Sequence, residues 1–355
     1  MSVYNLNSTM RNSSIAEPHS LPPGKTDWMW HEKGFRFPKT TSDGHLLPRI
    51  TIVTPSYNQG QFIEATIRSV LLQNYPNLEY IIIDGGSTDN SVEIIKKYEP
   101  YLAYWVSEKD RGQAHAINKG FAHASGDIYA YLNSDDFFER GALHSCAQAF
   151  RAGHQWVVGQ VQCWQEGIGC WPFPQLPGKS FTKWFLSCPI PQAGSFWSAE
   201  LHHEMGQFSE DLNYIIDYEF WLRLRFIKKI KPFFIDKSIA VYRIHSESKT
   251  VTLSFDFVQE SNSIREKYKH RLNFIQRGYL WAARRHRLAR IKGKKAVSLF
   301  KKGKFRLATR YLMSALVVWP LLAIDFHGFL LAFKKLSKRV KDEPDVLDLW
   351  PELDD

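Results

Sequence analysis

Residues 128–136 read Ile-Tyr-Ala-Tyr-Leu-Asn-Ser-Asp-Asp, an apolar run that ends in the adjacent carboxylates of Asp135 and Asp136. A short apolar run of this kind predicts a buried strand, which places the residues that follow it at the edge of a sheet. Carboxylate oxygens at such an edge can bind a divalent cation, and the cation can neutralise a diphosphate. The alternative is a polar turn that only closes the strand, because Asn, Ser and Asp all favour turns.

The body of the chain repeats one order of elements. Strand-like runs at 49–54, 80–83, 104–106 and 128–132 alternate with helical patterns at 62–71, 92–95 and 112–124. This alternation predicts an α/β fold with a mostly parallel sheet and helices on both faces. Ligands of such sheets bind beyond the carboxyl ends of the strands. We therefore expect the polar segments that follow the strands to meet at one edge of the sheet; they are 55–60, 84–89, 108–110 and 135–136.

The glycine pattern limits the kind of nucleotide site. The sequence contains no GxGxxG, which argues against a dinucleotide-binding Rossmann site, and no GxxxxGK[ST], which argues against a P-loop. The segments after the strands are instead rich in carboxylates. That composition favours a nucleotide diphosphate held through a metal ion.

Six motifs resemble those of family 2 glycosyltransferases, which have the GT-A fold. The motifs are ITIVTPSYNQGQFIEATIRSVLLQNYPNLEYIIIDGGSTDNS, SEKDRGQAHAINKGFAHASGD, YLNSDD, PQAGSFW, IIDYEFWLR and YRIHSESKT. They stand in the order of the family and cover roughly residues 47–250. The resemblance implies an inverting enzyme that moves a sugar from a nucleotide diphosphate-sugar, with a UDP-sugar as the expected donor, to a hydroxyl group. It also suggests a place in cell-surface polysaccharide or glycolipid synthesis.

The resemblance assigns a set of residues to the donor. The implied nucleotide-sugar contacts are Pro55, Ser56, Tyr57, Asp84, Asp110, Arg111, Asn118, Asp135, Gln192 and Arg243. Arg111 is expected near the phosphates, because a guanidinium suits phosphate oxygens. One position departs from the family: many members carry two consecutive acids after the second strand, and here the second position is Gly85. The nucleotide base therefore stays open.

The resemblance also assigns the metal ligands and the base. Asp136 is expected to coordinate Mg²⁺ or Mn²⁺ directly, with Asp135 facing the ribose or the metal and His245 as a further ligand. Asp217 is expected to open a helix and to act as the catalytic base for the acceptor hydroxyl. Glu219 lies two positions later and does not share a helix face with Asp217, so we expect it to pack at the helix start.

Charge is distributed very unevenly. Of the net charge of +10, residues 265–341 alone contribute +20, from 22 Lys and Arg against two acids, whereas residues 342–355 hold seven acids and neither Lys nor Arg. Basic tails meet nucleic acid or anionic membrane. The apolar run 311–333 is interrupted by Pro320 and Asp325, which favours a helical hairpin packed on the body or lying in a membrane interface.

These patterns predict four parts: a flexible segment 1–46, a GT-A catalytic domain 47–255, a basic helical extension 256–341 and an acidic tail 342–355. Four cysteines without metal-binding spacing and the lack of a signal peptide predict a cytoplasmic protein, with possible peripheral contact with the inner face of the membrane. The expected partners are the nucleotide-sugar donor and a saccharide or lipid-linked acceptor.

Two other functions remain as alternatives. A sugar-1-phosphate nucleotidyltransferase can share this kind of sheet, but the loop 55–60 lacks the basic residue that this class carries after its first strand. A non-catalytic nucleic-acid-binding protein would use the basic tail. The lack of interleaved aromatic and basic residues on a strand platform argues against that function, so we expect no nucleic acid as a partner.

Overall fold

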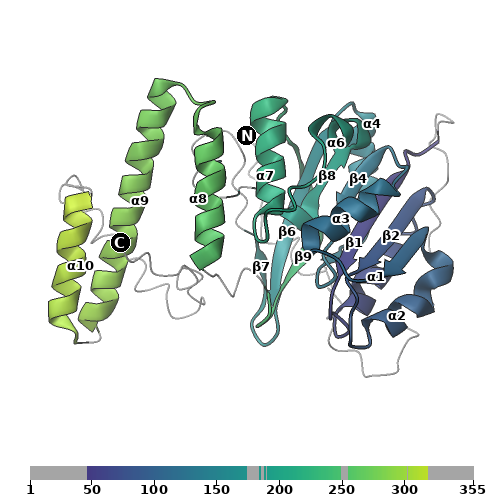
Figure 1. Ribbon diagram of the computed structural model, residues 1–355, viewed down its shortest axis with the longest axis horizontal. Coiled ribbons are helices and arrows are strands. Elements are labelled where there is room, and N and C mark those ends of the chain that lie inside the picture. Colours follow the sequence, from purple (N-terminus) through teal and green to yellow (C-terminus); the bar gives the residue numbers. More distant parts are fainter. Residues whose placement is uncertain are drawn as a thin grey trace, which may run out of the picture.

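A computed structural model describes residues 46–173, 184, 188, 190–248, 255–301 and 303–318 (Figure 1). The predicted flexible segment, apart from residue 46, lies outside these residues. So do the acidic tail and the part of the apolar run that begins at residue 319.

The first half of the sheet is parallel. Its strands are β1 (Ile50–Ser56), β2 (Leu78–Asp84), β3 (Tyr104–Ser107) and β4 (Ile128–Tyr131). They pair in the order β3-β2-β1-β4, each parallel to its neighbour. The helices between them are α1 (Ile63–Leu71), α2 (Ser91–Tyr98) and α3 (Gln113–Ala122). The predicted strand–helix alternation is confirmed. Strand β1 continues two residues further than expected, so that Pro55 and Ser56 belong to the strand and not to the loop.

The second half of the sheet is mixed. Its strands are β5 (Phe137–Phe138), β6 (Trp156–Gln165), β7 (Gly169–Pro172), β8 (Ser195–Ser198) and β9 (Phe233–Ile244). Strand β8 joins β4 to β6 through antiparallel pairs, β9 runs parallel to β6, and β5 and β7 pair antiparallel with β9 and β6. The order is β3-β2-β1-β4-β8-β6-β9-β5. The α-helices described in this half are α4 (Ala142–Arg151), α6 (Ala199–Met205) and α7 (Ile216–Leu222).

Two hydrophobic cores lie on opposite faces of the sheet. Successive residues of a strand point to opposite faces, and Ile52 and Val53 of β1 accordingly join different cores. The core of Ile52 is covered by α1, α2 and α4, and the core of Val53 by α3, α6 and α7. Helices thus cover both faces, as predicted. Trp197 and Trp221 are fully buried in the second core.

Helix α8 (Phe255–Lys269) packs on the body beside α7 (Figure 1). Ile264, Tyr268 and Leu272 are buried in the same core as α7. The hydrophobic core therefore extends past residue 255, where the catalytic domain was expected to end.

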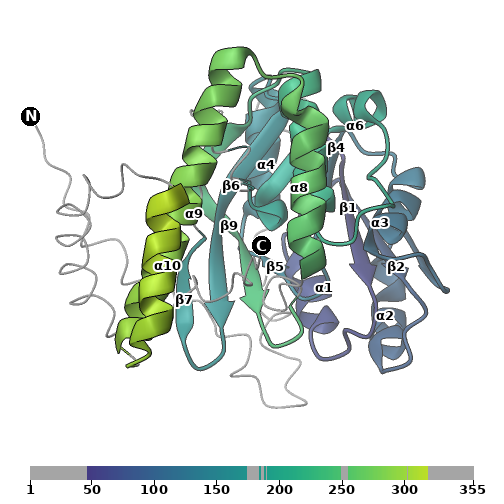
Figure 2. The same cartoon turned by 60° about the vertical axis from the view of Figure 1, so that its left-hand side comes forward.

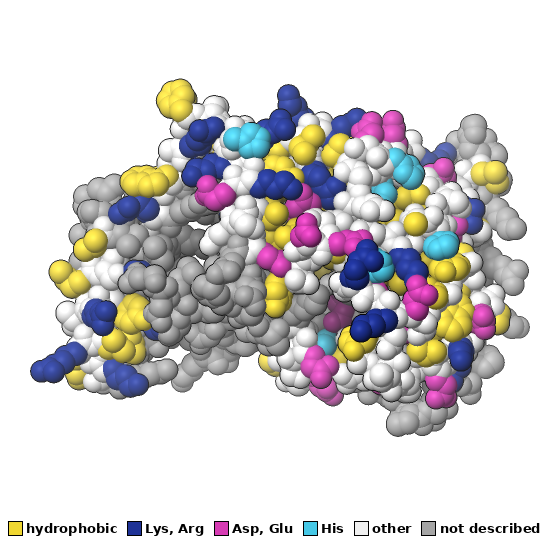
Figure 3. All heavy atoms as spheres, in the orientation of Figure 1, with side chains coloured by type: hydrophobic (Ala, Val, Ile, Leu, Met, Phe, Trp, Pro, Cys, Tyr) yellow, Lys and Arg dark blue, Asp and Glu magenta, His cyan; other side chains and the backbone are white. Residues whose placement is uncertain are grey.

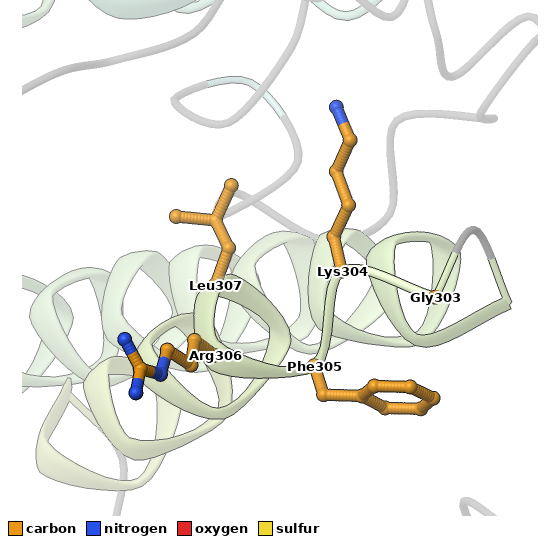
Figure 4. A pocket seen from close by; sticks show the side chains of 5 residues that line it. All are labelled: Gly303, Lys304, Phe305, Arg306 and Leu307. Atoms are coloured by element: carbon orange, nitrogen blue, oxygen red, sulfur yellow. The ribbon is translucent and has the colours of Figure 1, made fainter.

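Helices α9 (Phe274–Lys301) and α10 (Phe305–Val318) form an antiparallel pair at one end of the molecule (Figures 1 and 2). Lys292 Nζ donates a hydrogen bond to Ser314 Oγ across the pair at 2.7 Å. At the turn between the helices, residues 303–307 line a hollow (Figure 4). None of the helices among the described residues is both long and apolar enough to span a membrane.

Candidate active site

Asp84 organises the loop that follows β2. Its carboxylate is fully buried and accepts hydrogen bonds from the backbone N–H of Gly86 (3.1 Å) and Ser87 (2.9 Å) and from Ser107 Oγ (2.6 Å). These bonds hold the turn between β2 and α2 and tie it to β3. The structure thus places Asp84 beneath the loop, with its oxygens already occupied by protein donors.

The loop residue Gly85 lies against Asp110. A Cβ atom built on Gly85 would come within 2.8 Å of Asp110 Oδ2, so a larger residue there must displace the Asp110 carboxylate. Asp110 is positioned by the backbone N–H of Gly112, which donates to its Oδ1 at 2.8 Å. Next to this loop, Ser56 is buried at the end of β1, whereas the side chain of Tyr57 is 60% exposed. Tyr57 is therefore available to a ligand at this edge.

Arg111 and Asn118 both contact Glu210, in the segment before α7. Arg111 Nη2 donates to Glu210 Oε2 at 2.6 Å, and Asn118 Nδ2 donates to Glu210 Oε1 at 3.1 Å. The buried Asn118 also exchanges two hydrogen bonds with the backbone of Phe208. Both residues thus connect α3 to the second half of the chain, and their predicted contacts with the donor stay predictions.

Asn133 is the centre of a polar network at the end of β4. Gln113 Nε2 donates to Asn133 Oδ1 at 2.7 Å, and Asn133 Nδ2 donates to Gln192 Oε1 at 3.2 Å. Gln192 Nε2 in turn donates to the carbonyl oxygen of Tyr131 at 2.6 Å. The network brings Gln192 to this edge of the sheet. It also includes Gln113, which sequence reasoning missed although it lies in one of the quoted motifs.

The adjacent acids Asp135 and Asp136 have different surroundings. Asp135 is partly exposed, and its Oδ2 lies 3.1 Å from His245 Nε2. Asp136 is fully buried, and its Oδ1 accepts the backbone N–H of Arg243 at 3.0 Å. Burial, followed by the neighbouring charge of Asp135, raises the pKa of Asp136 well above its usual range. Asp135 is thus the acid that solvent reaches, and the expected direct coordination of a cation by Asp136 stays a prediction.

Arg243 is a buried cation beside this acid pair. Its Nε and Nη2 atoms make no hydrogen bond to the described residues, and its guanidinium stacks over the ring of Phe62, 4.8 Å from the centroid. The His245 ring lies 4.4 Å from the same ring. A buried guanidinium with unused donors is costly unless an anion binds it. Phe62 was missed because an apolar residue ahead of a helix carries no sequence signal of a site.

The donor atoms present suit a cation that binds together with phosphate. Among the described parts of the chain, no three His, Cys, Asp or Glu side chains gather as a complete metal site. Mg²⁺ and Mn²⁺ commonly use one or two protein ligands plus phosphate oxygens and water. Asp135 and His245 form such a partial set, and the unpaired donors of Arg243 lie on the same side of the sheet edge.

Asp217 lies in the first turn of α7 and is partly buried. Its Oδ1 accepts the backbone N–H of Tyr218 at 2.7 Å, and burial raises its pKa to about 6. Tyr131, at the end of β4, lies close to this acid: after burial, the charges of Asp217 and Asp136 both contribute to raising the pKa of Tyr131. Tyr131 also lies in the same hydrophobic core as Ile216 and Tyr218, so the beginning of α7 packs near the end of β4.

Glu219 points away from this region. Its side chain is buried against Arg223, whose Nε lies 2.9 Å from Glu219 Oε2, and against Tyr268, whose hydroxyl donates to Oε1 at 2.9 Å. The two acids of α7 thus have different partners. Sequence reasoning placed Glu219 at the helix start but did not identify Tyr268, because that contact joins residues 49 positions apart.

Solved structures share this fold. The crystal structure of S. aureus TarS 1-349 in complex with UDP-GlcNAc has a TM-score of 0.50 and 14% identity, covering 75% of this chain and 91% of that one. The mannosyltransferase PcManGT from Pyrobaculum calidifontis, in complex with GDP-Man and Mn²⁺, has a TM-score of 0.50 and 19% identity, covering 86% and 85%. At these identities the likeness concerns the fold, which is of the GT-A glycosyltransferase type.

Sequence comparison defines the family. The model of glycosyl transferase family 2 matches residues 51–221. An uncharacterized glycosyltransferase of Mycobacterium tuberculosis is 33% identical over 190 residues, which cover 50% of this chain and 68% of that protein. The GalNAc(5)-diNAcBac-PP-undecaprenol beta-1,3-glucosyltransferase of Campylobacter jejuni is 27% identical over 217 residues, covering 58% and 68%. The chain belongs to glycosyl transferase family 2, which confirms the resemblance seen in its motifs.

Proposed function

We propose that this glycosyltransferase is metal-dependent and inverting, and that it moves a sugar from a nucleotide diphosphate donor to a hydroxyl group in one in-line displacement. The observation that carries the proposal is the placement of Asp217, a partly buried acid with a pKa of about 6, across from the strand end that bears Asp135 and Asp136. In this arrangement the acceptor hydroxyl attacks the reacting carbon from the side of the base, opposite the departing diphosphate. Inversion of the anomeric configuration is therefore the expected outcome.

Asp217 is the proposed catalytic base. A carboxylate with a pKa near 6 is deprotonated at neutral pH yet basic enough to accept a proton from a hydroxyl as it attacks. Burial supplies this basicity, because the charged form is poorly solvated in its position. Glu219 is unsuited to the role, since its carboxylate is occupied by Arg223 and Tyr268.

Asp135 and His245 are the proposed direct ligands of Mg²⁺ or Mn²⁺. The buried Asp136 is proposed to hold the neighbouring backbone in place through its hydrogen bond with the N–H of Arg243. When bound, the cation supplies positive charge that stabilises the departing diphosphate. Arg243 adds a second positive group at the same place, and its Nε and Nη2 atoms make no hydrogen bond to the described residues, so they can donate to phosphate oxygens. The Mn²⁺ bound with GDP-Man in the Pyrobaculum enzyme supports a cation in this role.

The donor is proposed to lie along the ends of β1, β2 and β3. Tyr57 is exposed at that edge and Asp110 is the nearest carboxylate beside Gly85, so both are suited to contact the nucleoside. The neighbours of similar fold hold UDP-GlcNAc in one case and GDP-Man in the other. A UDP-sugar remains our proposal, and a GDP-sugar is the alternative to include in any assay.

The acceptor is proposed to be a lipid-linked saccharide at the inner surface of a membrane. The Campylobacter relative is named as a glucosyltransferase for an undecaprenol-linked acceptor, which supports this choice. The basic helices α9 and α10 are proposed to hold the enzyme peripherally at that surface. Family membership argues against the nucleotidyltransferase and the nucleic-acid-binding alternatives.

Turnover of UDP- and GDP-sugars, with Mg²⁺ or Mn²⁺ present, tests the proposed function. We expect one donor to support nucleotide release, and we expect NMR of the transfer product to show the opposite anomeric configuration from the donor. Asp217→Asn is nearly isosteric and should lower kcat by ~10²–10⁴-fold with donor binding preserved. Glu219→Gln is the informative comparison: full activity of Asp217→Asn together with loss in Glu219→Gln would show that the wrong carboxylate has been named.

A further inference from the structure

Helix α8 contacts the chain on both sides of Asp217. Ile264 and Tyr268 of α8 are buried in the same core as Tyr218 and Trp221 of α7. The guanidinium of Arg265 lies over the ring of Tyr218, 5.9 Å from its centroid. Helix α8 is thus packed directly against the helix that carries the proposed base.

The first contact precedes Asp217. Glu260 accepts two backbone hydrogen bonds through its two carboxylate oxygens, from the N–H of Asn213 at 2.8 Å and from the N–H of Tyr214 at 2.9 Å. These residues form the last part of the loop before α7. Charge-assisted bonds to two successive amides hold that loop more firmly than neutral bonds would.

The second contact follows Asp217. The Tyr268 hydroxyl donates to Glu219 Oε1 at 2.9 Å, and Lys267 Nζ lies 3.5 Å from the same oxygen. Arg223 neutralises the other oxygen of this buried carboxylate from within the helical segment. A buried carboxylate is strongly destabilising without such partners, so Glu219 ties α7 to α8 tightly.

The two contacts come from one face of α8. Glu260, Ile264 and Tyr268 are spaced by four residues, and side chains at that spacing lie on the same side of a helix. One face of α8 therefore contacts both ends of the segment 213–219, and Asp217 lies between the two contacts. This geometry fixes the backbone on both sides of Asp217, whose carboxylate accepts the backbone N–H of Tyr218 within the segment.

We propose that Glu260 and Tyr268 are positioning residues for Asp217, an inference that rests on the proposed role of Asp217 as the base. They hold the segment 213–219 so that the Asp217 carboxylate lies within hydrogen-bonding distance of the acceptor hydroxyl. A small displacement of a catalytic group lowers the rate steeply. The effect belongs to the chemical step and not to the binding of the donor, which lies on the other side of the site.

Tyr268→Phe is the direct test, because it removes the hydroxyl and keeps the buried ring. Tyr129→Phe is the matched control: it removes the hydroxyl of another tyrosine in the same core, whose hydrogen bond goes to the carbonyl oxygen of Ala124 at 3.2 Å. With the donor that supports turnover, we expect Tyr268→Phe to lower kcat by about 10-fold, with the donor KM unchanged. Tyr129→Phe should keep the wild-type kcat. Equal kcat values for the two variants would overturn the proposal.

Hydrogen exchange gives a readout that needs no substrate. Glu260→Gln keeps one acceptor oxygen but turns an amide N–H₂ toward the second backbone N–H, so we expect faster exchange of the amides of Asn213 and Tyr214. Tyr268→Phe should speed exchange within α7. Unchanged amide exchange in both variants would contradict the proposal that Glu260 and Tyr268 hold the segment 213–219.

A double variant separates this proposal from the proposed base. In an Asp217→Asn background, Tyr268→Phe should lower kcat no further, because both changes act through one carboxylate. If Asp217→Asn alone retains the wild-type kcat, the base is wrongly assigned. If Asp217→Asn is inactive while Tyr268→Phe is fully active, the base stands and the positioning role of α8 is wrong.

Discussion

Burial gives Asp217 a pKa of about 6, and this value makes two predictions about pH. The base must be deprotonated to act, so kcat/KM should fall about tenfold per pH unit below pH 6. Stability changes in the opposite sense: the folded protein keeps a proton on Asp217 that the unfolded chain has lost between pH 4 and 6. The stability contributed by this group is therefore present at low pH and disappears as the pH rises through 6.

Above pH 6 the folded protein holds Asp217 as a partly buried carboxylate, which lowers the free energy of unfolding. Asp217→Asn removes this buried charge. We expect the variant to be more stable than the wild type at pH 7.5, by at most about 3 kcal/mol and by less where solvent reaches the side chain. The gain should vanish near pH 4. Thermal unfolding at the two pH values measures it, with Asp211→Asn on the exposed surface as the control. An equal gain at both pH values would contradict the raised pKa.

The adjacent acids Asp135 and Asp136 should respond differently to substitution. Asp135 is the accessible acid beside His245, so Asp135→Ala should abolish Mn²⁺-dependent binding of UDP or GDP. Asp136→Asn keeps an oxygen for the backbone N–H of Arg243 and should leave much of that binding intact. Calorimetric titration with Mn²⁺ and nucleotide compares the two.

Full activity in excess EDTA would contradict metal dependence for any choice of ligand. Loss of Mn²⁺ binding in Asp136→Asn together with its retention in Asp135→Ala would restore Asp136 as the direct ligand, which the motif pattern had favoured.

Helix α3 lies so close to strand β1 that it admits only glycine at one position. A Cβ atom on Gly120 would come within 2.4 Å of Val53 Cγ1, in the core that α3 shares with the sheet. Gly120→Ala should therefore destabilise the protein by about 1–3 kcal/mol, as overpacking does. A lower Tm, measured by thermal unfolding, is the expected result.

Gly278 in α9 is the matched control, because no atom of the described residues lies within 4 Å of its added Cβ atom. Gly278→Ala should leave Tm unchanged or raise it, since alanine favours helix by about 1 kcal/mol. Equal losses of stability in the two variants would mean that the helix backbone, and not the contact with β1, sets the cost at Gly120.

At the scale of the whole molecule, charge divides the protein into two parts. Helix α9 carries nine Lys and Arg and no acid. The coloured side chains over α9 and α10 in Figure 3 are basic and apolar, whereas acids lie among Lys and Arg over the sheet. Trp281 and Val317 are 59% and 73% exposed, and Arg285 contacts both of them. Tryptophan beside arginine at an exposed surface suits the interface of an anionic membrane.

We therefore expect the full chain to sediment with anionic liposomes and to bind less at high salt, since part of the attraction is electrostatic. Replacing Trp281 and Val317 by serine should weaken binding at every salt concentration. A chain that ends at Asn273 should lose binding yet keep α8, whose Tyr268 and Leu272 complete the core. Liposome binding by that shorter chain, or none by the full chain, would show that α9 and α10 do not hold the protein at a membrane.

Local patterns in the sequence were sufficient to predict the α/β class, the strands β1 to β4 and the helices between them. Alternating apolar runs and helical spacing depend on neighbouring residues, and so does the rule that residues after parallel strands share one edge. For this reason Asp84 and Asp135 were expected after strands, and the structure places Asp84 as the last residue of β2 and Asp135 beyond the end of β4. The family followed from motifs whose order is itself a sequence property.

Only the tertiary structure decided which side chains meet. His245 reaches Asp135 across 110 residues, and Arg111 reaches Glu210 across 99. The mixed half of the sheet was also beyond the sequence, because the insertion of β9 between β6 and β5 depends on long-range pairing. Burial is also a property of the whole fold. Asp136 and Glu219 are buried, whereas Asp135 and Asp217 are only partly buried. His245 lies beside Asp135, Arg243 beside Asp136 and Tyr268 beside Glu219, and each of these partners comes from a distant part of the chain.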